Sequence, residues 1–202
     1  MNEAYILMDR SGSMSSMWGE AIDGVNEFVK KLDDVNVKFT IFDDISIDVV
    51  RNCHASNWDP VTTNEISPRG WTPLLDASGR AMTDILAEKP ERAVLVIVTD
   101  GYENASREFT KDSVKALIEK MNKANYEIVY LGANFDKVED VAHATLGVQN
   151  NAYNNSRIMS TTRAGFASAM GATATASADY FTKGVRADTF YSEVDRVKAA
   201  AK

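Results

Sequence analysis

Five residues in three separate segments carry side-chain oxygens of the kind that hold a hard metal cation. Asp9, Ser11 and Ser13 belong to the run Asp-Arg-Ser-Gly-Ser, Thr72 to Gly-Trp-Thr-Pro-Leu, and Asp100 to Val-Thr-Asp-Gly. Each segment alone also fits an ordinary turn or helix start, because Ser, Gly and Asp favour turns and Thr-Pro favours a first helical turn. Whether the five residues form one site therefore depends on the elements that position them.

Two apolar runs predict the strands that lead to the two aspartates. Residues 4–8 form a short apolar run that ends at Asp9, and residues 93–98 form a continuous aliphatic run just before Asp100. A run of the second kind is typical of a strand that is buried on both faces. A hairpin is predicted over 36–50, with Asp43-Asp44 as its turn.

The remaining pattern predicts helices between these strands. Apolar residues recur at helical spacing over 18–32, 74–86, 111–122 and 138–146, and residues 126–131 predict a further strand. We therefore expect an α/β fold: a Rossmann-like, doubly wound, mostly parallel sheet with one antiparallel edge strand and helices on both faces.

Such a sheet has a preferred place for ligands. They bind beyond the carboxyl ends of the strands, where the direction of the connections reverses. Asp9 and Asp100 each follow a predicted strand, and Thr72 begins the helix that leads to the second one. If the two strands are neighbours, the three segments meet at one rim of the sheet.

This pattern resembles a von Willebrand factor type A domain that carries a complete metal-ion-dependent adhesion site. That family has Asp-x-Ser-x-Ser after the first strand, a Thr before a helix and an Asp after the central strand; the matching residues are Asp9, Ser11, Ser13, Thr72 and Asp100. The resemblance covers about residues 4–146. Within the family, the sequence is most similar to small stand-alone type A proteins of bacteria and phages. It implies that the three hydroxyls touch the metal and that the two aspartates act directly or through water.

The donor types favour particular metals and a particular partner. Hydroxyl and carboxylate oxygens suit Mg²⁺ first, with Mn²⁺ or Ca²⁺ as alternatives, and no soft ligand favours zinc. Neutral hydroxyls leave much of the cation's charge uncompensated, so an open position would attract an Asp or Glu carboxylate of a partner protein. We therefore predict a metal-dependent protein-binding module without catalytic activity.

The rim of the site would select the partner. Aromatic residues and Arg are enriched at binding hot spots. On this basis and by proximity in the sequence, the candidates are Arg10, Met14, Trp71, Tyr102, Glu103 and Asn104. Trp18 is instead expected in the core, because it opens the periodic apolar pattern of its helix.

Bulk composition excludes several other functions. The formal net charge of −7 and a pI near 4.9 disfavour a nucleic-acid partner, which needs a basic face. Cys53 is the only cysteine, so we expect no internal disulfide and a reducing compartment. No apolar run approaches the roughly 18 residues of a membrane span, and the first residues lack the pattern of a signal peptide. The expected location is the cytoplasm.

The character of the chain changes in its last quarter. Residues 149–155 are rich in Asn, and 160–177 consist mostly of small residues, which fit either a closely packed helix or a loosely ordered stretch. A short amphipathic helix is predicted over 190–201. We assign 1–147 to the α/β domain and 148–202 to a partly helical C-terminal extension.

Two rival functions follow from the same residues. A self-assembling structural protein could dock the extension onto a second copy, even onto its metal site through Glu193 or Asp195. A magnesium-dependent phosphoryl-transfer enzyme resembling haloacid-dehalogenase phosphatases needs a second Asp two residues after the first, but Ser11 occupies that position. A serine hydrolase is also disfavoured, because there is no Gly-x-Ser-x-Gly and His54 and His143 have no evident nucleophile partner.

Overall fold

The computed structural model describes residues 1–133, 146, 156–161, 165–184 and 197–199. Within these residues, six strands form one sheet in the order β3-β2-β1-β4-β5-β6. The strands are β1 (Asn2–Asp9), β2 (Val35–Phe42), β3 (Ile47–His54), β4 (Arg92–Thr99), β5 (Glu127–Ala133) and β6 (Ser156–Thr161). All neighbouring pairs are parallel except β2 and β3, so β3 is the expected antiparallel edge strand.

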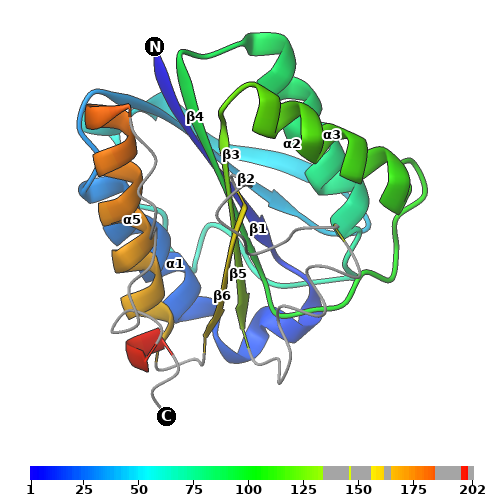
Figure 1. The fold of residues 1–202 in the computed structure, drawn as a ribbon. Coiled ribbons are helices and arrows are strands. Elements are labelled where there is room, and N and C mark those ends of the chain that lie inside the picture. Colours follow the sequence, from blue (N-terminus) through cyan, green and yellow to red (C-terminus); the bar gives the residue numbers. More distant parts are fainter. Residues whose placement is uncertain (134–145, 147–155, 162–164, 185–196, 200–202) are drawn as a thin grey trace.

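Helices cover both faces of the sheet, as Figure 1 shows. On one face lie α1 (Trp18–Lys30) and α5 (Phe166–Lys183), and on the other lie α2 (Leu74–Glu88) and α3 (Lys111–Lys123). Successive strand residues point to opposite faces, so β1 contributes Ala4, Ile6 and Met8 to one core and Tyr5 and Leu7 to the other. The predicted doubly wound α/β fold is confirmed.

Short 3₁₀ turns and a tight hairpin complete the connections near the sheet. The turns are η1 (Gly12–Ser16), which precedes α1, and η2 (Ala55–Asn57), which follows β3. The β2–β3 hairpin is confirmed, although β3 begins at Ile47 because the carboxylate of Asp43 accepts hydrogen bonds from the amides of Ile45 and Ser46.

Other sequence predictions agree or fall outside the described residues. Trp18 is buried, as expected, and its indole nitrogen donates to the carbonyl of Ile66 at 3.1 Å. Most of the helix predicted over 138–146 and most of the helix predicted over 190–201 lie outside the described residues. The same is true of His143, Glu193 and Asp195. No helix in the described ranges has the length and apolar character needed to cross a membrane.

The described parts of segment 148–202 belong to the same sheet and core as the rest of the chain. β6 pairs in parallel with β5, and α5 packs against α1 with Phe166, Met170 and Ala174 in the shared core. From Phe166 onward, the small-residue run predicted over 160–177 is therefore the closely packed helix of the two alternatives, whereas residues 160 and 161 end β6. The predicted boundary at 147 itself lies outside the described residues, but both elements beyond it extend the α/β fold.

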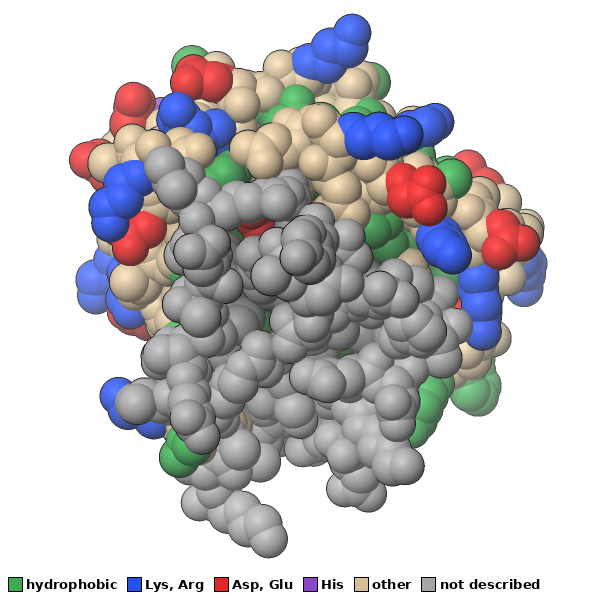
Figure 2. Space-filling view, in the orientation of Figure 1, with side chains coloured by type: hydrophobic (Ala, Val, Ile, Leu, Met, Phe, Trp, Pro, Cys, Tyr) green, Lys and Arg blue, Asp and Glu red, His purple; other side chains and the backbone are tan. Residues whose placement is uncertain are grey.

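Charged side chains of both signs are interspersed on the described part of the face seen in Figure 2. Lys and Arg do not merge into one continuous basic surface there. This distribution agrees with the negative net charge and offers no basic track for a phosphate backbone on that part of the molecule.

Glycine lets α1 and α5 approach closely. A Cβ atom at Gly24 would lie 2.7 Å from Cε1 of Phe166 and 3.0 Å from Cγ of Met170, whereas a Cβ at Gly19 would meet nothing within 4 Å. We expect Gly24→Ala to destabilise the fold by about 1–3 kcal/mol, because overpacking outweighs the better helix propensity of Ala. Gly19→Ala is the matched control and should be neutral or slightly stabilising in urea unfolding. Equal effects of the two substitutions would contradict a tight α1–α5 contact.

Candidate metal centre

The carboxyl ends of β1 and β4 lie side by side. Met8 pairs with Val98 in the parallel register of these neighbouring strands, so Asp9 and Asp100 emerge at the same rim. β1 leads through η1 to α1 on one face, whereas β4 leads to α3 on the other face. The two aspartates therefore stand at the point where the connections diverge, as the sequence predicts.

Hydrogen bonds join the first loop to Asp100. The hydroxyl of Ser13 donates to Oδ1 of Asp100 at 2.7 Å, and the hydroxyls of Ser11 and Ser13 lie 3.1 Å apart. The amide of Ser11 donates to Oδ1 of Asp9 at 2.7 Å. Side-chain oxygens from two of the three segments are thus in direct contact.

Thr72 brings the third segment to the same place. The ideal Cβ position at Gly101 lies 2.9 Å from Oγ1 of Thr72, 3.4 Å from Oδ2 of Asp9 and 3.5 Å from Oγ of Ser13. These three oxygens therefore surround one small region next to Gly101. A side chain at this glycine would crowd Thr72, so the absence of a Cβ there keeps the region open.

The spacing and type of the oxygens fit a hard cation. Adjacent ligands of an octahedral Mg²⁺, each about 2.1 Å from the metal, lie about 3 Å apart. The 3.1 Å between the Ser11 and Ser13 hydroxyls and the 2.7 Å between Ser13 and Asp100 match this edge. No group of three or more His, Cys, Asp and Glu side chains suited to a metal occurs in the described ranges. The candidate donors here are instead two carboxylates and three hydroxyls.

Neither Asp9 nor Asp100 has a positively charged side chain as an ion-pair partner among the described residues. Burial raises the pKa of Asp9 to about 6, although hydrogen bonds from Thr99 and Ser11 act in the opposite direction. Burial also raises the pKa of Asp100, against the hydrogen bond from Ser13. Among the described residues, no Lys or Arg makes an ion pair with either carboxylate. A bound cation would supply the charge that the surrounding side chains do not.

Thr99 and Asn104 fix the positions of Asp9 and Thr72, a role that the sequence alone does not predict. The Thr99 hydroxyl donates to Oδ2 of Asp9 at 2.7 Å and accepts from the amide of Gly101 at 3.1 Å. The side-chain oxygen of Asn104 accepts from the amide of Thr72 at 2.9 Å, and the Asn104 amide donates to the Thr72 carbonyl at 3.1 Å. In the sequence, the feature that could have indicated this role for Thr99 is its hydroxyl at the end of an otherwise aliphatic strand.

Thr72 does not cap α2, although a Thr-Pro pair favours a first helical turn. The helix begins at Leu74, and no side-chain cap comes from the residue before it. Instead, the amide of Leu75 donates to Oε2 of Glu103 at 2.8 Å, and the amide of Asp76 donates to the hydroxyl of Ser106 at 3.1 Å. The loop after β4 thus satisfies two of the free amides at the helix start, and the Thr72 hydroxyl lies beside Gly101.

The predicted rim divides into exposed and buried residues. Trp71 and Tyr102 are 64% and 63% exposed, so both are accessible to a partner. Arg10 and Met14 are 7% and 0% exposed, so the prediction that they form the rim is wrong. Arg10 is buried because its guanidinium pairs with the enclosed carboxylate of Asp43.

Glu103 and Asn104 also differ from simple rim residues. Glu103 is half-buried, and its two oxygens accept from the amides of Leu75, Ala105 and Ser106. Asn104 is exposed, but its amide oxygen is engaged by Thr72. The main contacts of both side chains are therefore with the Thr72 loop, the start of α2 and the loop after β4.

An ion-pair network centred on the buried carboxylate of Asp43 supports the loops. Oδ2 of Asp43 accepts from Nε of Arg10 at 2.8 Å and from Nε of Arg69 at 2.6 Å. The amide of Arg69 donates to the carbonyl of Arg10 at 2.6 Å, and the amide of Gly12 donates to the carbonyl of Gly70 at 3.1 Å. The loop with the two serines and the loop with Thr72 are therefore tied to each other and to the β2–β3 turn.

Comparison with known proteins identifies the fold but no close relative. No protein-family model and no curated protein matches the chain. The vWF domain of the type V pili tip protein Mfa5 from Porphyromonas gingivalis is 12% identical, with a TM-score of 0.63 and 92% of this chain and 96% of that chain covered. The SpRpn10 VWA domain is 13% identical, with a TM-score of 0.55 and coverage of 81% and 89%.

A third structure is a longer chain. The D319A mutant of the PilB minor pilin from Streptococcus sanguinis is 12% identical, with a TM-score of 0.61. The match covers 92% of this chain and 64% of the pilin chain, so the protein spans less than two thirds of that chain's length. At these identities the likeness concerns the fold alone. The chain has a von Willebrand factor type A-like fold.

Proposed function

We propose that the protein is a metal-dependent protein-binding module. In this proposal Asp9, Ser11, Ser13, Thr72 and Asp100 together hold one divalent cation, with Mg²⁺ favoured and Mn²⁺ or Ca²⁺ as alternatives. The observation that carries the proposal is the convergence of side-chain oxygens from three loops on the region beside Gly101. When bound, the cation would offer an electrophilic position to an Asp or Glu carboxylate of a partner.

The protein's own residues define the side of approach. Asp9, Ser11 and Thr72 are buried, whereas Ser13 is exposed and Asp100 is half-buried. A partner carboxylate would therefore approach over Ser13 and Asp100. Trp71 and Tyr102, exposed in the adjoining loops, would provide large apolar surfaces around that contact.

The protein is proposed to bind its partner without catalysing a reaction. Ser11 lies where a phosphatase of the haloacid-dehalogenase kind would need its second carboxylate, and its hydroxyl contacts Ser13 rather than a general base. The similar structures are named as a pili tip protein and a minor pilin, which favours a role in protein contact for this fold. The cytoplasmic location remains a prediction of the sequence.

Affinity capture from native lysate tests the proposal. The wild-type protein, Thr72→Ala and the control Thr63→Ala serve as bait, each in Mg²⁺ and in EDTA; Thr63 is exposed in the loop after β3. We expect wild type and Thr63→Ala to retain the same proteins in Mg²⁺ and lose them in EDTA, and Thr72→Ala to retain none of them. Retention of the same proteins under all conditions would exclude a metal-bridged contact. Robust hydrolysis of p-nitrophenyl phosphate would instead favour a phosphoryl-transfer enzyme.

A further inference from the structure

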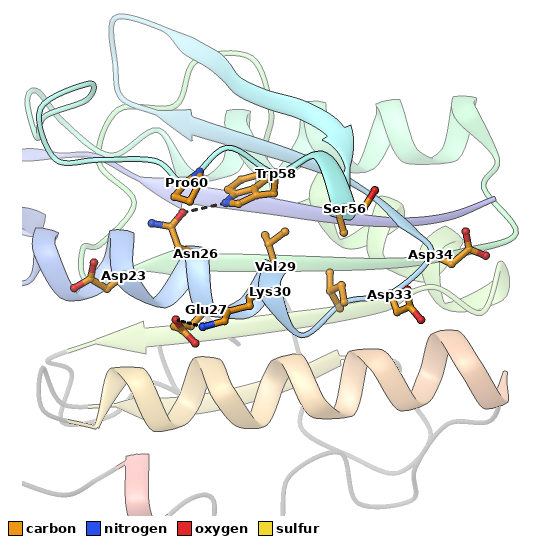
Figure 3. Close-up of a pocket in the computed structure, with 12 residues that line it drawn as sticks. Asp23, Asn26, Glu27, Val29, Lys30, Asp33, Asp34, Ser56, Trp58 and Pro60 are labelled. Carbon is orange, nitrogen blue, oxygen red and sulfur yellow. Dashed lines mark hydrogen bonds and ion pairs between the residues drawn. The ribbon is translucent and has the colours of Figure 1, made fainter.

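A groove separates α1 from the segment that follows β3. It encloses about 840 Å³ and is lined on one side by α1 and the residues after it, and on the other by residues 55, 56, 58 and 60 (Figure 3). Asp33 and Asp34 lie just before β2, which is parallel to β1, so this end of the groove is near the amino ends of the strands. The proposed metal centre lies at their carboxyl ends.

The walls of the groove are fixed to each other by one residue. Oδ1 of Asn26 accepts from the indole nitrogen of Trp58 at 3.1 Å and from the amide of Val61 at 2.9 Å. Nδ2 of Asn26 donates to the carbonyl of Val61 at 2.8 Å. Trp58 also packs against Phe39, with ring centroids 6.3 Å apart. A ligand would therefore find a preformed surface and would not have to order it.

The lining combines an apolar middle with acidic ends. Trp58 and Pro60 supply the accessible apolar surface, and Val29 and Leu32, which also line the groove, are almost fully buried. Figure 3 shows Asp23 toward one end of the groove and Asp33 and Asp34 at the other, with Val29 and Trp58 between them. A ligand along the groove would thus pass from carboxylate to apolar surface to carboxylate.

The acidic charge of the groove is largely uncompensated. Its lining contains the carboxylates of Asp23, Glu27, Asp33 and Asp34 and a single cation, Lys30, which pairs with Glu27 at 3.4 Å. Asp34 lies 3.5 Å from the imidazole of His54. In the part of the chain that the structure describes, Asp23 and Asp33 make no ion pair. The carboxyl end of α1 adds partial negative charge close to Asp33.

We infer that this groove binds a basic, extended segment of a protein partner, with an apolar side chain between two positively charged ones. The apolar side chain packs against Trp58 and Pro60, and the positive charges meet Asp23 at one end and Asp33 and Asp34 at the other. Asp23 and Lys30 are about 10 Å apart along the helix, and Asp33 lies beyond, so charges roughly four residues apart in an extended chain span the groove. Phosphate-bearing ligands are repelled by the same carboxylates.

The test uses the full chain in EDTA, so that it does not depend on the proposed metal centre. The probe is the capped peptide Lys-Ala-Leu-Ala-Lys, and the comparison peptides are Gln-Ala-Leu-Ala-Gln and Glu-Ala-Leu-Ala-Glu. In ¹H–¹⁵N correlation spectra, we expect the Lys peptide to shift amides of α1 and of residues 55–61. The other two peptides should bind more weakly in the order of their charge.

Matched variants decide whether the carboxylates are responsible. The double variant Asp23→Asn/Asp33→Asn should bind the Lys peptide roughly threefold to tenfold more weakly, as expected for two exposed ion pairs. The control Asp112→Asn/Glu119→Gln removes two exposed charges from α3 and should bind like wild type. No shifts at millimolar peptide, shifts outside the groove, equal binding of the three peptides or an unchanged affinity of the Asp23/Asp33 variant would each overturn the inference.

Discussion

Asp9→Ala should abolish measurable Mg²⁺ binding in a calorimetric titration that detects it with the wild-type protein. The Asp9 carboxylate is fully buried, and one of its oxygens lies at the region shared with Thr72 and Ser13. Its removal deletes both a ligand oxygen and one of the two negative charges that favour a divalent cation. Because loss of even an outer-shell partner weakens metal sites by about 10–100-fold, we expect a loss of at least about 100-fold.

Thermal unfolding provides the second measurement for this variant. A cation that binds only the folded protein raises its unfolding temperature by mass action. Added Mg²⁺ should therefore stabilise the wild type and the control Asp112→Ala, whose side chain is exposed on α3, but not Asp9→Ala. A folded Asp9→Ala protein, checked by circular dichroism in EDTA, that still binds Mg²⁺ with wild-type affinity would show that the cation is held elsewhere.

Asp43→Ala should destabilise the fold by about 3–5 kcal/mol, as is typical when one partner of a buried ion pair is removed. The Asp43 side chain is fully buried and is the partner of Arg10, itself almost fully buried, and of Arg69. Its other oxygen accepts from the amides of Ile45 and Ser46. Urea unfolding measures the loss, which is a large part of the roughly 5–15 kcal/mol that stabilises a typical domain.

Asp48→Ala is the matched control for this ion pair. Asp48 lies 3.9 Å from Nη1 of Arg10, but its side chain is 51% exposed. We expect a much smaller loss of stability, as is usual for exposed ion pairs. Similar losses of stability for Asp43→Ala and Asp48→Ala would show that the burial of Asp43 does not determine its contribution to stability.

The difference between wild type and Asp43→Ala should depend on pH in a defined direction. Burial alone would raise the pKa of Asp43, but hydrogen bonds from Arg69 and the amides of Ser46 and Ile45, with the charge of Arg10, hold it below its usual value. A carboxylate with a lower pKa in the folded state stabilises the fold above its unfolded pKa, near 3.9. Its contribution is lost as the pH falls through the folded value. The difference in unfolding free energy between wild type and Asp43→Ala should therefore become smaller below about pH 4. A constant difference down to about pH 2 would show that the ionised Asp43 carboxylate is not its cause.

Much of the fold was predictable from local pattern. The aliphatic run before Asp100 and the shorter run before Asp9 became neighbouring strands of one parallel sheet, as expected. The doubly wound layering followed from the alternation of apolar runs with helical periodicity, because both signals depend on residues close together in the sequence. The small-residue segment gave no such signal, and its placement as α5 depends on the contact of Gly24 with Phe166.

The rim of the candidate site was predicted less well, and for a physical reason. Arg and Met beside a ligand loop are good candidates for partner contact by residue type alone. Arg10 is buried because Asp43, in the turn between β2 and β3, neutralises it, and Met14 is buried because the turn before α1 directs it into the core. Likewise, Thr72 is free to face the site only because Glu103 and Ser106 satisfy the amides at the start of α2.

The sequence by itself determined the fold class and the identity of the five oxygen-bearing residues, since strand ends and residue types can be read locally. Only the tertiary structure decided that oxygens of three of them, Asp9, Ser13 and Thr72, converge beside Gly101, which neighbours are buried, and that α1 and the segment after β3 enclose an acidic groove. These properties arise from contacts between residues far apart in the chain, and the free energy of such contacts depends on burial and charge that exist only after folding.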